Sequence, residues 1–242
     1  MIMRSLLLCI IILCAHVVKA QDSTVVTLQT WSDLTTIHEF NEKWIYSGDY
    51  GIRGALSNED WTTFYARPTF RYNASLKLNV RAGVSVFYTA EELLESQTEL
   101  RFHQQVNLTW PNFSDWILKH MIRFEERFFY YKALDNDFSA RARYRIALET
   151  PDVKVFGIKN SFYGLTSFEL FAPLGVQSVE QYINNNRIVV GIGHRAGLKL
   201  KFELHYIFQN SKNYKEENFQ TSEHILRLRT FLITKRADPV EP

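Results

Sequence analysis

The residues best able to do chemistry in this chain are arginines and glutamates that recur at two-residue spacing. Arg141, Arg143 and Arg145 alternate along one segment, and on an extended strand they would share one face, about 7 Å apart. Guanidinium groups at that spacing repel one another unless carboxylates from neighbouring strands lie between them. Glu125 and Glu169 stand in the neighbouring segments. The pattern therefore predicts a network of ion pairs on one face of a sheet, with Arg143 contacting at least one of these glutamates.

The same face carries a larger predicted set of charged residues. If the sheet closes into a barrel, these side chains fill its lumen, either as a packed ion-pair network or as the lining of a narrow, anion-preferring passage. Both interpretations stay open at the level of sequence. The set comprises Arg101, Arg123, Glu125, Arg127, Arg141, Arg143, Arg145, Glu169, Arg187, Arg195, Glu203, Arg227 and Arg229.

Catalytic and metal chemistry find less support. His103 and His205 share the charged face and could form a metal pair, but inward histidines are more often members of hydrogen-bond networks. His120 and His194 lie on the opposite face, and no serine stands beside them as in the outer-membrane lipases. There is no nucleophile elbow of the G-x-S-x-G type. We expect no catalytic residue, no metal and no cofactor, and hence no enzyme.

A strict alternation of apolar and polar residues identifies the elements that position these groups. It is clearest in residues 76–88 and 198–208, where the even-numbered side chains are mostly apolar and the odd-numbered ones mostly polar. A period of two predicts β-strands. Further strands are predicted at 43–54, 61–72, 99–110, 118–130, 139–149, 162–171, 187–195 and 223–232, with a weaker one in 24–40.

The apolar face of these segments carries one full charge, Glu126, for which we expect a local break in strand register. The segments are long enough to cross a bilayer when tilted, and their aromatic residues cluster near the ends. These features favour an all-β fold, an antiparallel transmembrane β-barrel with an apolar outside. The alternative is a secreted soluble β-barrel that binds an apolar ligand, in which the even-numbered residues would line the cavity.

Long connections alternate with tight ones, as expected of such barrels. The long ones fall at 55–60, 89–97, 131–137, 173–183 and 210–221. About eleven strands can be counted, whereas single-chain bacterial barrels have an even number. We therefore expect about 12 strands, with 10 as the fallback. The twelfth would be a second strand within 24–40 or a strand at 153–158.

The first residues predict export. A positive start at Met1–Arg4 and an apolar run at Leu6–Leu13 are typical of a signal peptide, with cleavage expected before Gln21. Both cysteines lie in this segment, so the mature chain would form no disulfide. It would carry 26 basic and 26 acidic residues, and this balance argues against binding to nucleic acid.

The expected organisation is thus a signal peptide at 1–20, an outer-membrane barrel at 21–234 and a polar tail at 235–242. Several segments of this chain resemble a known family in their order and spacing. They read RFHQQVNL at 101–108, HMIRFEERF at 120–128, SARARYRIALETP at 139–151 and NNRIVVGIGHRAGLKLKFELHYIFQ at 185–209.

With these segments the chain resembles the domain of unknown function 2490 family of small outer-membrane proteins. The resemblance implies a barrel in the outer membrane of a Gram-negative bacterium, with membrane lipid and the outer-membrane assembly machinery as partners. It implies no established activity and no known small-molecule ligand. One departure is the end of the chain, where Phe231 precedes a polar tail instead of a terminal aromatic residue.

Overall fold

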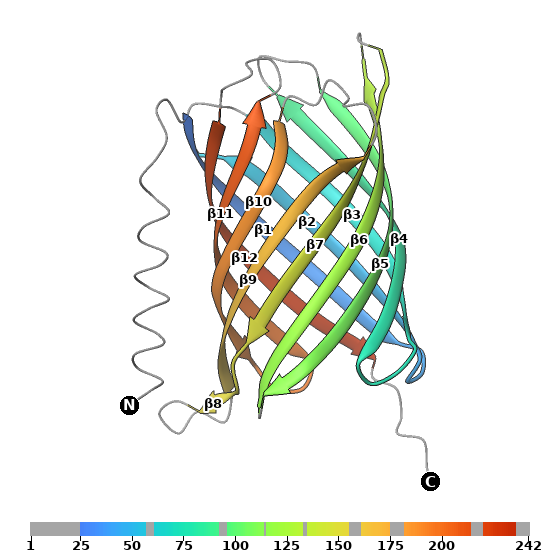
Figure 1. Cartoon of the computed structure of the whole chain (residues 1–242), viewed down its shortest axis with the longest axis vertical. Helices are drawn as coiled ribbons and strands as arrows, with labels where there is room; N and C mark the ends of the chain where they lie inside the picture. The colour runs from blue at the N-terminus through green and yellow to red at the C-terminus, as the bar shows by residue number, and fades with distance from the viewer. Residues whose placement is uncertain are drawn as a thin grey trace.

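The computed structural model describes residues 25–56, 61–91, 96–113, 115–132, 135–154, 161–174, 182–213 and 220–235. Every regular element in these ranges is a strand, and together they form a tall barrel (Figure 1). No helix in this part of the chain is long and apolar enough to cross a membrane. The strands are β1 (Val25–Glu39), β2 (Trp44–Ala55), β3 (Trp61–Asn73), β4 (Leu78–Glu91), β5 (Gln97–Phe113), β6 (Trp116–Tyr131), β7 (Asp137–Glu149), β8 (Val153–Lys154), β9 (Ser161–Leu174), β10 (Tyr182–Arg195), β11 (Leu200–Asn213) and β12 (Gln220–Lys235).

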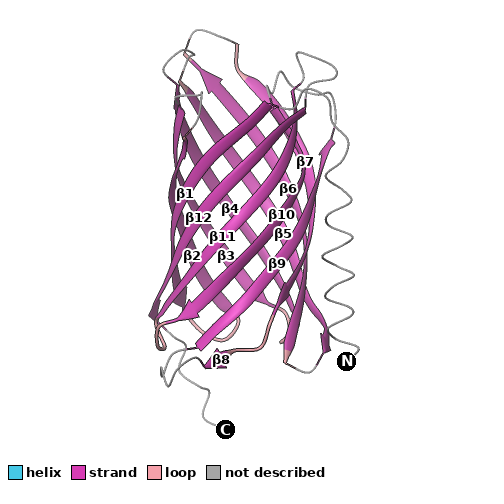
Figure 2. Cartoon of the chain, turned by 90° about the vertical axis from the view of Figure 1, so that its left-hand side faces the viewer, coloured by secondary structure: helices cyan, strands magenta, loops and turns pink. Residues whose placement is uncertain are grey.

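Eleven of these strands close the wall of the barrel. Wall strands that follow one another along the chain pair antiparallel. Because β8 is not part of the wall, β7 pairs with β9, which in turn pairs with β10. The two-residue strand β8 pairs only with the start of β9. Closure comes from β1 and β12, which run parallel from Val25 to His38 (Figure 2). An odd number of alternating strands requires this, because the first and the last then point the same way.

The predicted all-β barrel of about twelve strands is confirmed. The twelfth strand is β8, within the segment 153–158 that the sequence offered as one of two possibilities. Region 24–40 forms the single strand β1. The sequence predicted an even number of strands in the wall. In the structure β8 lies outside the wall, so eleven strands remain and the barrel closes on a parallel pair.

The connections divide the barrel into two ends. At the end drawn uppermost in Figure 1, here called the loop end, the connections are 56–60, 92–96, 132–136, 175–181 and 214–219. At the opposite end, here called the turn end, they are 40–43, 74–77, 114–115, 150–160 and 196–199. The loop-end connections have five to seven residues and the turn-end connections two to four, apart from 150–160, which contains β8. The contrast between long and tight connections is therefore smaller than the sequence predicted.

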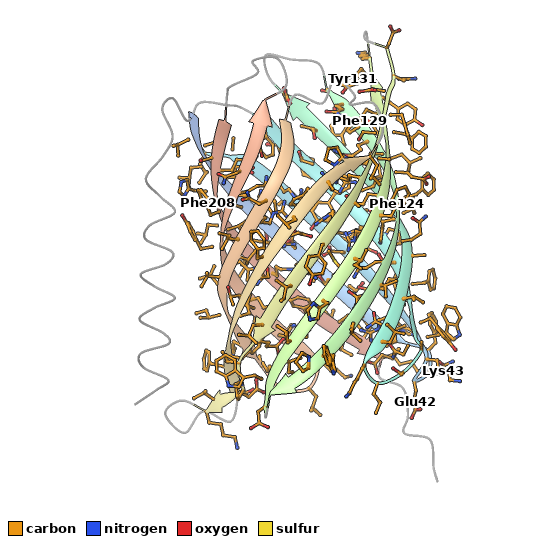
Figure 3. All side chains as sticks on the ribbon, viewed as in Figure 1. Glu42, Lys43, Phe124, Phe129, Tyr131 and Phe208 are labelled. Atoms are coloured by element: carbon orange, nitrogen blue, oxygen red, sulfur yellow. The ribbon has the colours of Figure 1, made fainter. Side chains whose placement is uncertain are left out.

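The two faces of the wall differ as the alternation predicted. In β4, Val86 is 45% exposed on the outside, whereas Phe87 is 4% exposed on the inside. In β11 the same contrast separates Tyr206 at 49% from Ile207 at 0%. Figure 3 shows Phe124 and Phe208 projecting outward from the wall. The molecule therefore has an apolar exterior, and its buried core is the filled lumen.

Two glycines on the inner face make room for bulky inward side chains. A Cβ at Gly83 would lie 2.7 Å from His103 Cε1, and a Cβ at Gly191 would lie 2.7 Å from His205 Cδ2. Each histidine stands directly across from its glycine on the neighbouring strand. The glycine in each pair lets the imidazole ring lie against the wall.

One expectation about register is wrong. The pairing of β6 with β5 and β7 runs without interruption through Glu125 and Glu126. Glu126 simply keeps the outward parity, opposite Phe102 and Ala140. A single outward charge did not require a bulge, because Glu126 is partly exposed on the outer wall, in the loop-end half of β6, within a continuous ladder.

Candidate functional site: the charged lumen

Glu125 on β6 is the centre of the charged lumen. Its side chain is completely buried, and four arginines surround it. The pairing of the strands explains this, because Arg141 lies directly opposite Glu125 on β7 and the others stand one step away on β5, β6 and β7. The nitrogen–oxygen distances are 2.7 Å from Arg143, 2.7 Å from Arg141, 3.3 Å from Arg123 and 3.7 Å from Arg101.

Arg143 joins this centre to a second carboxylate, Glu169 on β9. Its Nη1 donates to Glu125 Oε1 at 2.7 Å, while its Nη2 donates to Glu169 Oε1 at 2.8 Å. Arg187 approaches the other oxygen of Glu169 at 3.6 Å. The predicted contact of Arg143 is therefore confirmed for both glutamates. One guanidinium group thus bridges carboxylates on β6 and β9, and it fixes the relative position of these two strands.

Glu99 on β5 forms a third centre nearer the loop end. Arg101 Nη2 lies 2.7 Å from Glu99 Oε1, and Arg127 Nε donates to the same oxygen at 2.8 Å. All three side chains are buried. Arg101 also faces Glu125, so the networks around Glu99 and Glu125 are continuous.

The opposite wall contributes two aspartates that the sequence reasoning did not include in the site. Asp33 on β1 accepts from Arg227 and from the Tyr65 hydroxyl, and Arg229 lies 3.9 Å away. Asp49 on β2 accepts from Arg67 and from Thr35. Asp33 was missed because the alternation in its segment is weak. The signal that could have revealed it is its odd parity with Gln29, Trp31 and Thr35, all inward.

The turn end holds a fourth group around Glu203 on β11. This carboxylate accepts from the Tyr163 hydroxyl at 2.6 Å and from Lys201 Nζ at 3.0 Å, and Arg229 Nη1 lies 3.6 Å away. Arg195 lies farther out, at the rim, where its side chain is 37% exposed and pairs with Glu149 and Asp152.

The structure also places aromatic rings among the charges, which the sequence reasoning missed. The guanidinium carbon of Arg53 lies 4.1 Å from the Trp31 ring centroid and 4.7 Å from that of Tyr65. Arg101 lies over Phe87 at 4.3 Å. Ring faces attract cations, so these aromatic residues complement arginine where a carboxylate is absent or shared. Further such contacts include Arg127 over Phe129, Arg143 over Phe171 and Arg195 over Tyr163.

The middle of the lumen is filled. Ile207 and Ile225 are fully buried and pack with Trp31 and Val189 in an apolar cluster. Beside it, Glu223 accepts hydrogen bonds from Ser211 at 2.7 Å, Gln209 at 2.7 Å and Gln29 at 3.2 Å. The described interior thus contains carboxylates, arginines and apolar side chains packed beside one another.

The two inward histidines are far apart in the wall. His103 on β5 lies 3.3 Å from the Thr69 hydroxyl, and His205 on β11 lies 3.1 Å from Glu203. No group of three potential metal ligands occurs among the residues that the structure describes. On the outer wall, His120 contacts the Tyr144 hydroxyl at 2.8 Å and the Trp110 carbonyl oxygen at 2.9 Å.

Of the thirteen predicted lumen residues, twelve take part in these ion pairs. Arg145 faces the lumen near the turn end and forms none among the described residues. The order of the strands explains the assembly: β5, β6, β7 and β9 are consecutive around the wall, and so are β10, β11, β12 and β1.

The comparisons with known proteins agree with the sequence motifs. The chain matches the family model described as "Protein of unknown function (DUF2490)" over residues 28–220, from β1 to the start of β12. No curated protein and no solved structure matches the chain. This match covers most of the barrel, and the chain belongs to the DUF2490 family.

Proposed function

We propose that this chain is an outer-membrane β-barrel protein of a Gram-negative bacterium whose lumen is held closed by its arginine–carboxylate network. The observation that carries the proposal is the reversed polarity of the wall. Large apolar side chains such as Ile122, Val190 and Ile192 are 55–61% exposed outside, while Glu125 and Glu169 are at most 1% exposed inside. Water would favour the opposite arrangement, and a bilayer favours this one.

Strand length and closure support membrane insertion. The wall strands have 12 to 17 residues, which exceeds the roughly 9–11 residues needed to span a bilayer with tilt. Their backbone groups pair around the whole circumference, including the parallel β1–β12 junction. In lipid an unpaired edge would cost several kcal/mol for each backbone group.

Aromatic pairs on the outer wall occupy both ends, as interfacial girdles do. At the turn end the rings of Trp44 and Tyr72 are 5.0 Å apart. Toward the loop end the rings of Phe128 and Phe138 are 5.0 Å apart. Amphipathic rings favour the boundary between hydrocarbon and water, so these pairs support two membrane interfaces separated by the apolar band.

The proposed role is structural rather than catalytic or conducting. Burial of charges in the lumen is tolerated only when they are paired, and the paired arrangement leaves the centre of the barrel packed. Membrane lipid and the outer-membrane assembly machinery are the proposed partners, reached after removal of the signal peptide at 1–20.

The alternative, a soluble barrel that binds an apolar ligand, requires the even-numbered apolar residues on the inside. In the structure Leu78, Val80 and Val86 are instead 37–45% exposed on the outer wall. The interior that such a ligand would enter is charged. This geometry argues for the membrane protein over the soluble carrier.

Cell fractionation combined with gel mobility tests the proposal. We expect the protein in the outer-membrane fraction, with an unheated sample migrating faster than a boiled one because the closed barrel resists unfolding. Recovery of the folded protein in the soluble fraction without detergent would contradict it.

A further inference from the structure

Three inward arginines near the turn end form no ion pair with a carboxylate of the described residues. Arg71 on β3, Arg81 on β4 and Arg145 on β7 each lie within four residues of the turn end of their strands. Arg71 and Arg81 are directly paired across β3 and β4, and the charges of both Arg71 and Arg145 act on Arg81. We call these three residues the turn-end arginine cluster. Like charges so placed in a barrel need a counter-charge.

The other lumen arginines contrast with this cluster. For example, Arg67 pairs with Asp49, Arg227 pairs with Asp33, and Arg229 lies near Glu203. Arg53 lies between aromatic rings instead. Within the described part of the chain, no carboxylate lies within ion-pair distance of the turn-end arginine cluster.

The nearest carboxylates are already engaged or remote. Glu169 stands opposite Arg145 on β9 and its charge acts on Arg145, but its oxygens lie within ion-pair distance of Arg143 and Arg187 and not of Arg145. Glu39 at the end of β1 acts on Arg71 from two strands away. The Nε of Arg71 is buried and has no hydrogen-bond acceptor among the described residues.

Neighbouring amide groups supply one acceptor to the cluster. Arg81 Nε donates to Asn79 Oδ1 at 3.1 Å, and Asn107 Nδ2 donates to the same oxygen at 2.9 Å. The Gln105 side-chain oxygen accepts from Arg123. The side-chain oxygens of Asn79 and Gln105 are thus already used, and the guanidinium groups of the cluster keep donors free.

The three arginines of the cluster are partly exposed, whereas the Glu125 side chain has no exposed surface. The connections of the loop end carry eight acidic and two basic residues, while those of the turn end carry three acidic and five basic ones. A small anion would therefore be attracted to the turn end and repelled from the loop end.

From this geometry we infer that the turn-end arginine cluster is a binding site for a phosphate-type oxyanion, either free phosphate or the phosphate of a lipid headgroup. Guanidinium forks match the oxygens of such an anion. The bound anion supplies the negative charge that carboxylates supply to most other arginines of the lumen. The inference concerns the lumen alone, and the test below is carried out in detergent, independently of where the protein resides.

The test compares thermal unfolding of the purified barrel in non-ionic detergent with increasing inorganic phosphate, against chloride at equal ionic strength. Phosphate should raise the melting temperature of the natural protein with a saturable dependence. Arg81→Gln should weaken this response at least about tenfold, the loss of one charge-assisted contact. Lys77→Gln, which removes an exposed charge at the same end, should keep the response.

A second pair of measurements separates the two sources and guards against misfolding. A short-chain phosphatidylglycerol at equal concentration should reproduce the stabilisation if a headgroup fits, whereas a response to inorganic phosphate alone identifies the free ion. Without phosphate, Arg81→Gln should melt no lower than the natural protein, because it removes an uncompensated charge. The inference is overturned if neither ligand stabilises the natural protein, if Arg81→Gln responds like the natural protein, or if Arg81→Gln fails to fold.

Discussion

At the scale of single residues, the molecule depends on carboxylates that are shared among several arginines. Glu125 has no exposed surface and faces four guanidinium groups. Arg143 in turn serves two carboxylates. In such a network the removal of one member leaves a buried charge without a partner, which costs more than the pair itself contributes.

Replacement of Arg143 by methionine therefore tests the network. Arg143→Met leaves Glu125 and Glu169 under-compensated, and we expect a loss of about 3–5 kcal/mol in the free energy of unfolding. Urea unfolding in detergent micelles measures it. The matched control is Arg195→Met at the half-exposed rim, which should cost about 1 kcal/mol or less. Equal losses in the two variants would refute a buried network.

The outer face has its own single-residue test. Val84 stands near the middle of β4 with outward parity, so Val84→Arg should cost about 2–4 kcal/mol in a bilayer. Leu76→Arg places the same charge in the fully exposed turn and should be mild. Assembly into liposomes, followed by gel mobility, measures both. The membrane orientation of β4 fails if the two variants assemble equally well.

At the scale of elements, the parallel pair β1–β12 is as necessary as any antiparallel pair. Leu228 lies in the centre of β12, paired with Ser32 on one side and Leu204 on the other. Leu228→Pro removes a ladder donor and should prevent closure. Val153→Pro changes β8, which is outside the wall, and should leave the heat-modifiable band intact. A closed barrel in Leu228→Pro, or its loss in Val153→Pro, would contradict the observed topology.

The strands were largely predictable, whereas their closure was not. Alternation located the strands and their faces, because a sheet with one apolar and one charged face admits no slip of register. The parallel junction follows from strand number, and the two-residue β8 is too short to show any periodicity. Glu126 misled the prediction of register, since a single outward charge is accommodated in an uninterrupted ladder.

The site was predictable only in part. The arginines and glutamates of the lumen could be predicted because they occupy the same face of each strand, at alternate positions. Asp33 stayed hidden in a segment of weak alternation, and rings such as Trp31 and Phe171 stayed hidden because apolar residues on the charged face break the pattern. Which arginine pairs with which carboxylate depends on register between strands distant in sequence, as for Arg227 with Asp33, and no local pattern encodes it.

At the scale of the whole molecule, the two ends of the barrel differ in charge, and the connections of the loop end are longer than those of the turn end except for 150–160. If the long connections face outward, as in related architectures, a membrane-impermeant thiol reagent should distinguish the ends in intact cells. The chain has no cysteine beyond the first twenty residues, so single cysteines report cleanly. Asp135→Cys should be labelled from outside, and Lys77→Cys only after lysis. The reverse pattern would invert the proposed orientation.

The central claim is that this chain is a membrane barrel whose lumen is closed by its own charges. Its most direct test is the conductance of the purified protein in planar bilayers, with insertion verified by flotation of the same preparation in liposomes. The packed centre around Glu125, Ile207 and Ile225 predicts little steady conductance. A steady, anion-selective conductance that Arg143→Glu reverses would contradict the claim and establish a passage in its place.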